Sequence, residues 1–150
     1  MKIAIENRQR RQQIGVKRVR RVAERILSAL ALADRELSVV IVGDRTIRSL
    51  NRDYLGKDRP TNVISFAMNE GEHSGINPLL LGDVVISADT AAKEAEDAAI
   101  PFFSRFAFLL MHGILHLAGF DHERSGEVEA ARMEAKEQEI FALLEQEGLL

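Results

Sequence analysis

The hydrophobic positions of this chain recur with two spacings, one typical of strands and one typical of helices. Alternating apolar and polar residues, or short β-branched runs, predict strands. Recurrence every three or four residues predicts amphipathic helices. The predicted strands cover residues 2–6, 37–42, 62–67 and 82–87, and the predicted helices cover about 14–32, 44–51, 89–99, 103–118 and 125–146. We therefore expect an α+β fold, with a small mixed sheet of about four strands surrounded by helices.

Polar residues and helix breakers mark the ends of these elements. Asp44 is expected to cap a short helix that ends at Asn51, and Asp89 to cap the alanine-rich helix that follows it. Loops are expected at residues 55–60 and 68–81, where glycine and proline occur. The chain contains neither repeats nor a linker, and its 150 residues fit one domain, so residues 1–150 are predicted to form a single domain.

The predicted helix at 103–118 is apolar on almost every side. A helix of this kind belongs in the centre of a fold. Burying a polar side chain without a partner costs free energy. His112 and His116, which both lie on this helix, therefore require a specific reason to be there.

Three of the four histidines lie within eleven residues. His112 and His116 are one helical turn apart, so their imidazoles can converge on one ion. Gly119 can end the helix in a left-handed conformation, and the returning chain can bring His122 to the same ion. Three imidazole ligands with an open fourth position are typical of a catalytic zinc site. His73, the fourth histidine, is interpreted as an ordinary surface residue.

The same histidine spacing occurs in zinc peptidases, which makes a zincin-like metallopeptidase a rival interpretation. In those enzymes a glutamate follows the first histidine and acts as the general base. Here that position is Gly113, which has no side chain. Either another residue supplies the base, or the metal does most of the work, since zinc can lower the pKa of bound water to about 7. A cation also suits phosphodiester cleavage, because it neutralises charge on phosphoryl oxygens.

Charge is distributed unevenly along the chain. The formal net charge is −3, yet residues 1–35 hold ten Lys/Arg and three Asp/Glu, whereas residues 123–150 hold three Lys/Arg and eight Asp/Glu. On the first predicted helix, Arg18, Arg21 and Arg25 share a face. This face is either simply solvated or able to steer an RNA backbone.

Composition narrows the function classes further. Seven Phe, one Tyr and no Trp leave few rings for nucleic-acid stacking, and most Phe fall in apolar runs, so base readout by stacking is not expected. The absence of Cys excludes thiolate zinc ligands and suits a cytoplasmic location. No secretory signal and no uninterrupted apolar run of about 18 residues is found, so no membrane span is expected.

The motifs resemble those of the YbeY family of bacterial endoribonucleases. Residues 112–122 read HGILHLAGFDH, residues 56–66 read GKDRPTNVISF, and residues 81–86 read LGDVVI. The segment from Met133 to Ile140 also looks like the last helix of the family. Together these similarities extend from about residue 37 to 144 in the family's order.

The resemblance implies one zinc ion bound by His112, His116 and His122, with His112 also assigned to catalysis. It implies cleavage of single-stranded RNA, maturation of the 3′ end of 16S ribosomal RNA and ribosome quality control. The expected partners are single-stranded RNA and the ribosome or its small subunit. Arg18, Arg21 and the neighbouring Arg25 are then expected to contact RNA.

One position departs from the family pattern. An arginine usually precedes the Gly-Lys-Asp of the second motif, and here that position is Leu55. Arg59 is the candidate for the missing catalytic cation, with a solvated loop charge as the alternative, and Lys57 is expected to bind RNA. Asp121 either orients a histidine N–H and so takes part in catalysis, or caps the turn. Glu134 is a weaker candidate for the orienting role.

Two other functions stay open besides the nuclease. One is a non-catalytic ribosome-assembly factor in which the metal only stabilises the fold, and the other is the metallopeptidase. The nucleophile, which is either water or the ribose 2′-hydroxyl, also stays open.

Overall fold

The computed structural model describes residues 2–68, 78–120 and 126–150. The elements in these residues are β1 (Lys2–Asn7), α1 (Val16–Ala29), β2 (Glu36–Val42), α2 (Asp44–Leu55), β3 (Val63–Ala67), β4 (Leu80–Ser87), α3 (Ala88–Ala98), α4 (Phe102–Leu117) and α5 (Gly126–Gln146). The predicted loop at 68–81 is too long at its end, because Leu80 and Leu81 already belong to β4. Residues 69–77 of that predicted loop lie outside the described residues.

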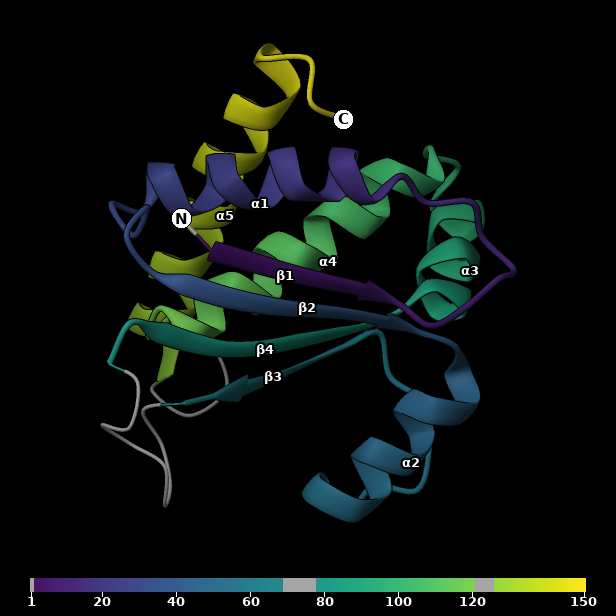
Figure 1. Ribbon diagram of the computed structural model, residues 1–150. Helices are drawn as coiled ribbons and strands as arrows, with labels where there is room; N and C mark the ends of the chain where they lie inside the picture. Colours follow the sequence, from purple (N-terminus) through teal and green to yellow (C-terminus); the bar gives the residue numbers. More distant parts are fainter. Residues whose placement is uncertain (1, 69–77, 121–125) are drawn as a thin grey trace.

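The four strands form one mixed sheet in the order β1-β2-β4-β3 (Figure 1). β1, β2 and β4 run parallel, and β3 pairs antiparallel with β4 at one edge. Parallel neighbours require crossover connections, which here contain helices. The expected α+β fold, a single domain with a four-stranded mixed sheet surrounded by helices, is confirmed.

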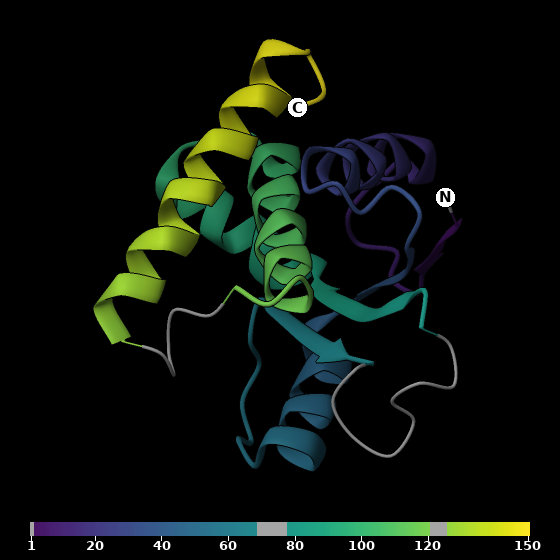
Figure 2. The ribbon, with the colours of Figure 1, turned by 90° about the vertical axis from the view of Figure 1, so that its left-hand side faces the viewer.

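Side chains that alternate along the strands build a core on each face of the sheet. Leu37, Val39 and Ile41 of β2 belong to the main core, whereas Val40 and Val42 join a smaller cluster with α2. Helices α1, α3, α4 and α5 lie on the first face, and α2 lies on the second (Figure 2). Helix α2 therefore lies across the sheet from α1, α4 and α5 and meets α3 where both helices begin.

Helix α4 lies at the centre of the main core, as its sequence predicts. Ten of its sixteen residues are buried, and the helix contacts the sheet and the other three helices of its layer. Among the described residues, no single helix is long and apolar enough to cross a membrane; α3 and α4 meet that test only as a pair, and this pair is bent by 119°.

Two predicted helix ends are wrong. The first helix ends at Ala29 and not near residue 32, because Ala31 takes a left-handed conformation with φ of 59° and the N–H of Leu32 bonds back to the Leu27 carbonyl. Helix α2 continues past Asn51 to Leu55. It ends at Gly56, whose φ of 72° is the left-handed conformation that glycine adopts without strain.

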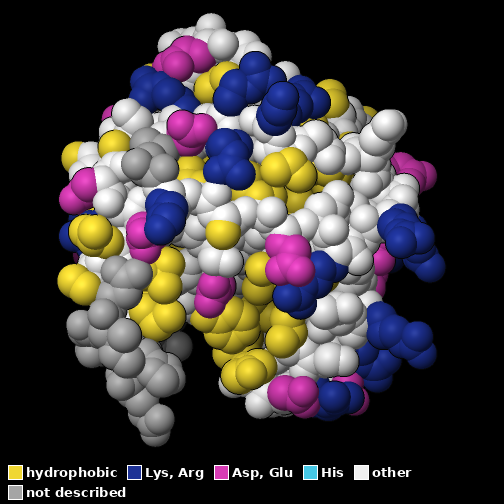
Figure 3. Space-filling model, in the orientation of Figure 1, with side chains coloured by type: hydrophobic (Ala, Val, Ile, Leu, Met, Phe, Trp, Pro, Cys, Tyr) yellow, Lys and Arg dark blue, Asp and Glu magenta, His cyan; other side chains and the backbone are white. Residues whose placement is uncertain are grey.

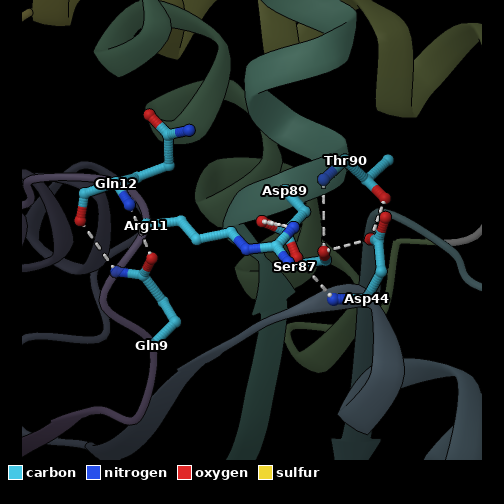
Figure 4. A network of polar contacts seen from close by, with 7 residues as sticks. All are labelled: Gln9, Arg11, Gln12, Asp44, Ser87, Asp89 and Thr90. Carbon is cyan, nitrogen blue, oxygen red and sulfur yellow. Dashed lines mark hydrogen bonds and ion pairs between the residues drawn. The ribbon is translucent and has the colours of Figure 1, made fainter.

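The predicted caps are also exchanged between helices (Figure 4). Asp44 does not cap α2; its carboxylate accepts hydrogen bonds from the hydroxyls of Ser87 and Thr90 at the start of α3. Ser87 caps α3, and Asp89 instead accepts the backbone N–H of Asp44 at 2.9 Å. Each aspartate thus stabilises the other helix, because the carboxyl ends of β2 and β4 are neighbours in the sheet. Arg11 adds a cation 3.9 Å from the Asp89 carboxylate.

The sheet and α4 approach each other most tightly at Gly113. A Cβ built there lies 2.6 Å from Val84 Cγ1 and 3.2 Å from Ser65 Oγ. The Ser65 hydroxyl also donates a 2.9 Å hydrogen bond to the Gly113 carbonyl. Only a residue without a side chain allows this separation, so Gly113 determines how close the histidines on either side of it lie to the sheet.

We expect Gly113→Ala to reduce the free energy of unfolding by roughly 1–3 kcal/mol, because overpacking costs more than the helix propensity of alanine returns. Urea denaturation measures the change. Gly15→Ala is the control, since the nearest atom to an added Cβ there is 3.8 Å away; it should cost under about 1 kcal/mol. Equal stability of the Gly113→Ala and wild-type proteins would contradict this packing.

Candidate metal and active site

His112 and His116 meet on the side of α4 that faces α5. Their Nε2 atoms are 3.1 Å apart, and their rings are nearly perpendicular, with centroids 4.6 Å apart. The helical spacing therefore does bring the two imidazoles together. His122 and Asp121, the other two residues expected here, lie outside the described residues.

Glu137 of α5 contacts the first of these rings. Its Oε2 is 2.9 Å from Nδ1 of His112. Only 8% of Glu137 is exposed, and among the described residues it is the one acidic or basic residue that is buried. A carboxylate at Nδ1 accepts the ring proton there, which leaves the Nε2 lone pair of His112 directed at His116.

Within the described part of the chain, Glu137 is therefore a carboxylate of α5 that contacts a histidine, whereas the residue expected from the sequence is Glu134. Glu134 is exposed and lines a groove beside the pair. The sequence contains a signal that identifies Glu137: the buried positions of α5 are Met133, Glu137, Ile140 and Leu144. Three apolar residues on one helical face with one glutamate among them predict a buried carboxylate that needs a partner.

The histidine pair has a geometry that suits a metal. Two nitrogens that share a tetrahedral zinc ion at about 2.0–2.1 Å lie about 3.3 Å from each other, close to the 3.1 Å between the two Nε2 atoms. Within residues 2–68, 78–120 and 126–150, no group of three His, Asp or Glu side chains is placed to hold an ion. A third ligand from residues 121–125 is neither supported nor opposed by this result.

An aromatic and acidic groove borders the pair on the α5 side. Phe108 stacks against His112 with ring centroids 6.5 Å apart, and Phe141 meets Phe108 edge-on. Three carboxylates, those of Glu134, Glu137 and Glu145, line the same groove. Because like charges repel, this side of the site disfavours the phosphates of a nucleic acid.

Arg105 is a cation that the sequence interpretation did not select. It lies two turns before His112, with its guanidinium 5.2 Å from the Phe108 ring. Glu94 holds it through a 3.0 Å contact, and Asn62 in turn donates to Glu94. The second sequence motif, which includes Asn62, is thus joined to α4 through these polar contacts.

Position 113 does not face the histidine pair. A side chain there would enter the sheet between Val84 and Ser65. A glutamate at this position, which is the general base in zinc peptidases, would not fit between α4 and the sheet. This chain therefore keeps the histidine spacing of zinc peptidases but has no room at position 113 for their general base.

The arginines of α1 lie away from the histidines. The guanidinium of Arg18 is 3.8 Å above the ring of Phe103, which is nine residues before His112, or about 13 Å along a helix. Arg25 pairs with Glu147 at 2.8 Å, and this hydrogen bond lowers the pKa of the Glu147 carboxyl. Arg21 is exposed. The structure does not gather these three arginines at the candidate site.

Lys57 and Arg59 lie in the loop that follows α2, and both are exposed. The buried side chain of Asn51 donates to the Arg59 carbonyl at 2.9 Å and so fixes the loop to the helix. Between them, Asp58 is paired with Arg48, and that hydrogen bond lowers the pKa of the Asp58 carboxyl. Leu55, at the position of the family arginine, is 53% exposed.

Comparison with known proteins decides the family. A family model described as Endoribonuclease YbeY matches residues 4–145. The chain belongs to the YbeY family. The Endoribonuclease YbeY of Geobacter metallireducens is 69% identical over 150 residues, and the match covers both chains completely. That of Syntrophotalea carbinolica is 57% identical over 147 residues, covering 98% of each chain.

A solved structure has a similar fold. The solution structure of TM1509 from Thermotoga maritima matches with a TM-score of 0.62, covering 98% of this chain and 94% of that one. Its sequence identity is 22%, so this likeness concerns the fold alone. The resemblance inferred from the YbeY motifs is confirmed by the family match.

We expect the neutral imidazole of His112 to carry its proton on Nδ1 in metal-free protein, because Glu137 accepts it there. Nitrogen-15 NMR of the ring nitrogens distinguishes the tautomers. Glu137→Leu should mix them, whereas Glu134→Leu, one turn earlier, should leave the spectrum unchanged. A wild-type His112 protonated only on Nε2 would contradict the hydrogen bond to Glu137.

Proposed function

We propose that this protein is a zinc-dependent endoribonuclease specific for single-stranded RNA. We further propose that it acts in the cytoplasm on the ribosome or its small subunit, in maturation of the 3′ end of 16S ribosomal RNA and in ribosome quality control. One observation carries the metal-dependent part of this proposal. The Nε2 atoms of His112 and His116 are 3.1 Å apart, and the buried Glu137 carboxylate contacts Nδ1 of His112. Membership of an endoribonuclease family supports the RNA substrate.

His112, His116 and His122 are the proposed ligands of one zinc ion. In this proposal Glu137 holds the proton of His112 on Nδ1, so that Nε2 presents a lone pair. For His116 to bind the metal through Nε2, its ring proton would be carried on Nδ1, because a ligating imidazole nitrogen carries no proton. The bond from Glu137 also keeps the His112 ring from rotating.

A zinc ion in this position would supply Lewis-acid polarisation of a phosphodiester and activation of water. Arg59 is the proposed cation for the charge that develops on the phosphate, which its planar guanidinium can bind in a bidentate manner. Asp121 is proposed to orient a reacting group or a histidine N–H. Lys57 is proposed to bind RNA phosphates beside the site.

Arg18, Arg21 and Arg25 have a different proposed role. Because Arg18 lies at the far end of α4 and Arg25 already pairs with Glu147, we assign them to phosphates of the ribosomal RNA remote from the cleaved bond. Exposed cations at such a distance strengthen binding through counterion release and have no effect on the bond that breaks.

The packing of Gly113 argues against the peptidase alternative. A side chain at this position would enter the sheet, so the residue that activates water in such peptidases is missing for a structural reason. The non-catalytic assembly factor differs from the nuclease in one measurable respect: the purified protein would cleave no RNA, with or without bound metal.

We expect the purified protein to bind one zinc ion per chain, and His116→Ala to abolish this binding. Glu137→Gln should weaken zinc affinity by roughly 10–100-fold, as expected for a residue that orients a ligand. Competition with a chromogenic chelator measures both affinities. Glu134→Gln removes a carboxylate from the same groove and should change the affinity little. Equal zinc affinity of Glu137→Gln and wild type would refute the orienting role.

We expect zinc-loaded protein to cleave single-stranded RNA and to leave an unstructured protein intact. A chelator should stop cleavage, and His112→Ala should reduce it to background while circular dichroism shows a folded protein. Normal maturation of ribosomal RNA in cells that contain only a folded His112→Ala protein would favour the assembly factor. Chelator-sensitive proteolysis without RNA cleavage would favour the peptidase.

A further inference from the structure

Tyr54 is an exposed aromatic residue at the C-terminal end of α2. The chain has seven Phe and one Tyr, and all eight lie within the described residues. Of these eight side chains only Tyr54 is exposed to solvent, with 68% of its surface accessible. The Tyr54 ring makes an edge-to-face contact with the ring of Phe66 in β3, with centroids 5.4 Å apart and an angle of 71° between the ring planes. This contact holds the Tyr54 ring in place although it leaves most of the ring in solvent.

The position of Tyr54 follows from the length of α2. Ile47 and Leu50 pack on the second face of the sheet, and Tyr54 continues the same helical stripe four residues after Leu50. Figure 3 shows hydrophobic side chains at the surface beside this end of α2, with charged side chains at their margin. Leu55, the next residue, is also exposed, and a group of exposed apolar side chains bordered by charges is typical of a binding surface.

The charges around Tyr54 favour an anionic partner. Lys57 and Arg59 follow it by three and five residues, and in the described part of the chain no ion pair engages either side chain. The two nearby carboxylates, Asp53 and Asp58, are already paired with arginines of α2. Two exposed cations without an ion-pair partner therefore follow Tyr54 in the loop after α2, in contrast to the acidic groove between α4 and α5.

The sheet edge connects this surface with the histidines. Within the residues that the structure describes, β3 pairs with β4 alone, so it forms one edge of the described sheet. Phe66 of β3 points to the α2 side, where it meets Tyr54, and the preceding Ser65 points to α4, where it bonds to Gly113. Tyr54 therefore packs on one face of the edge strand β3, and α4, the helix that carries the histidine pair, packs on the other face.

We propose that Tyr54 is a stacking platform for an unpaired RNA base, with Lys57 binding the adjacent phosphate and Arg59 the phosphate that is cleaved. The single strand passes around the β3 edge and brings its next phosphates to His112 and His116. The inference rests on the proposed nuclease function and extends it, because stacking on one ring requires an unpaired base and so explains a preference for single strands. It also revises the expectation, drawn from composition, that stacking plays no part.

Intrinsic fluorescence tests the platform directly, because Tyr54 is the only tyrosine and the chain has no tryptophan. A short single-stranded RNA, shown by gel to stay intact during the measurement, should quench this emission as it binds. Inorganic polyphosphate carries the same kind of charge without bases and should quench it far less. The same emission in RNA-bound and free protein would overturn the proposal.

Variants separate stacking from folding. Tyr54→Ala should weaken RNA binding by roughly 5–150-fold, the effect of losing one stacked base, and should act mainly on KM. Tyr54→Phe keeps the ring and should bind within about twofold of wild type. Ile100→Ala is the matched control, since it removes another exposed apolar side chain, and it should bind RNA normally. Thermal melting of each variant verifies the fold.

The outcomes distinguish this inference from the proposed function. Wild-type protein that cleaves RNA, with an equally active Tyr54→Ala, would overturn the platform and leave the nuclease standing. Wild-type protein that neither binds nor cleaves RNA would overturn both. A Tyr54→Ala protein that binds free RNA normally but no longer associates with ribosomal particles would assign the ring to a protein partner, and this result also contradicts the proposal.

Discussion

The close contact between α4 and the sheet at Gly113 is the constraint on which the rest of the structure depends. The missing side chain lets the helix lie directly on Val84 and Ser65. With that side of α4 held against the strands, the helical turn directs His112 and His116 away from the sheet and toward α5. The same contact removes the possibility of a peptidase base at position 113. A glycine that looks like a lost catalytic residue in the sequence is therefore a packing residue in the fold.

The packing of α5 against α4 provides the second requirement. A buried carboxylate is stable only when it is hydrogen-bonded, and Glu137 satisfies this requirement through His112. Folding and site assembly are therefore coupled, since the residue that stabilises the interface between the two helices is the one that orients the first imidazole. The aromatic rings of Phe108 and Phe141 close the interface around this bond and lower its exposure to water.

Much of the fold is predictable from the sequence, because it depends on local periodicity. The burial of α4 on almost every side follows from its apolar sequence, and the approach of its two histidines follows from helical geometry. The exchanged caps at Asp44 and Asp89 do not, because they depend on β2 and β4 being neighbours in a sheet whose order is not written in local patterns. Tyr54 was also missed, since the count of aromatic residues gives no information about which ring extends past the core. Glu137 was predictable in principle from its place on the apolar stripe of α5.

The position of Glu137 near the C-terminus has a consequence for biosynthesis. A chain is made from its N-terminus, and the early segments of a domain can form structure first. All four strands and α4 precede α5 in the sequence, so both histidines are already synthesised while the carboxylate that orients one of them is still missing. If RNA cleavage depends on that orientation, nascent chains and fragments truncated before residue 137 lack an assembled centre. The protein would then become active only after its own translation is nearly complete.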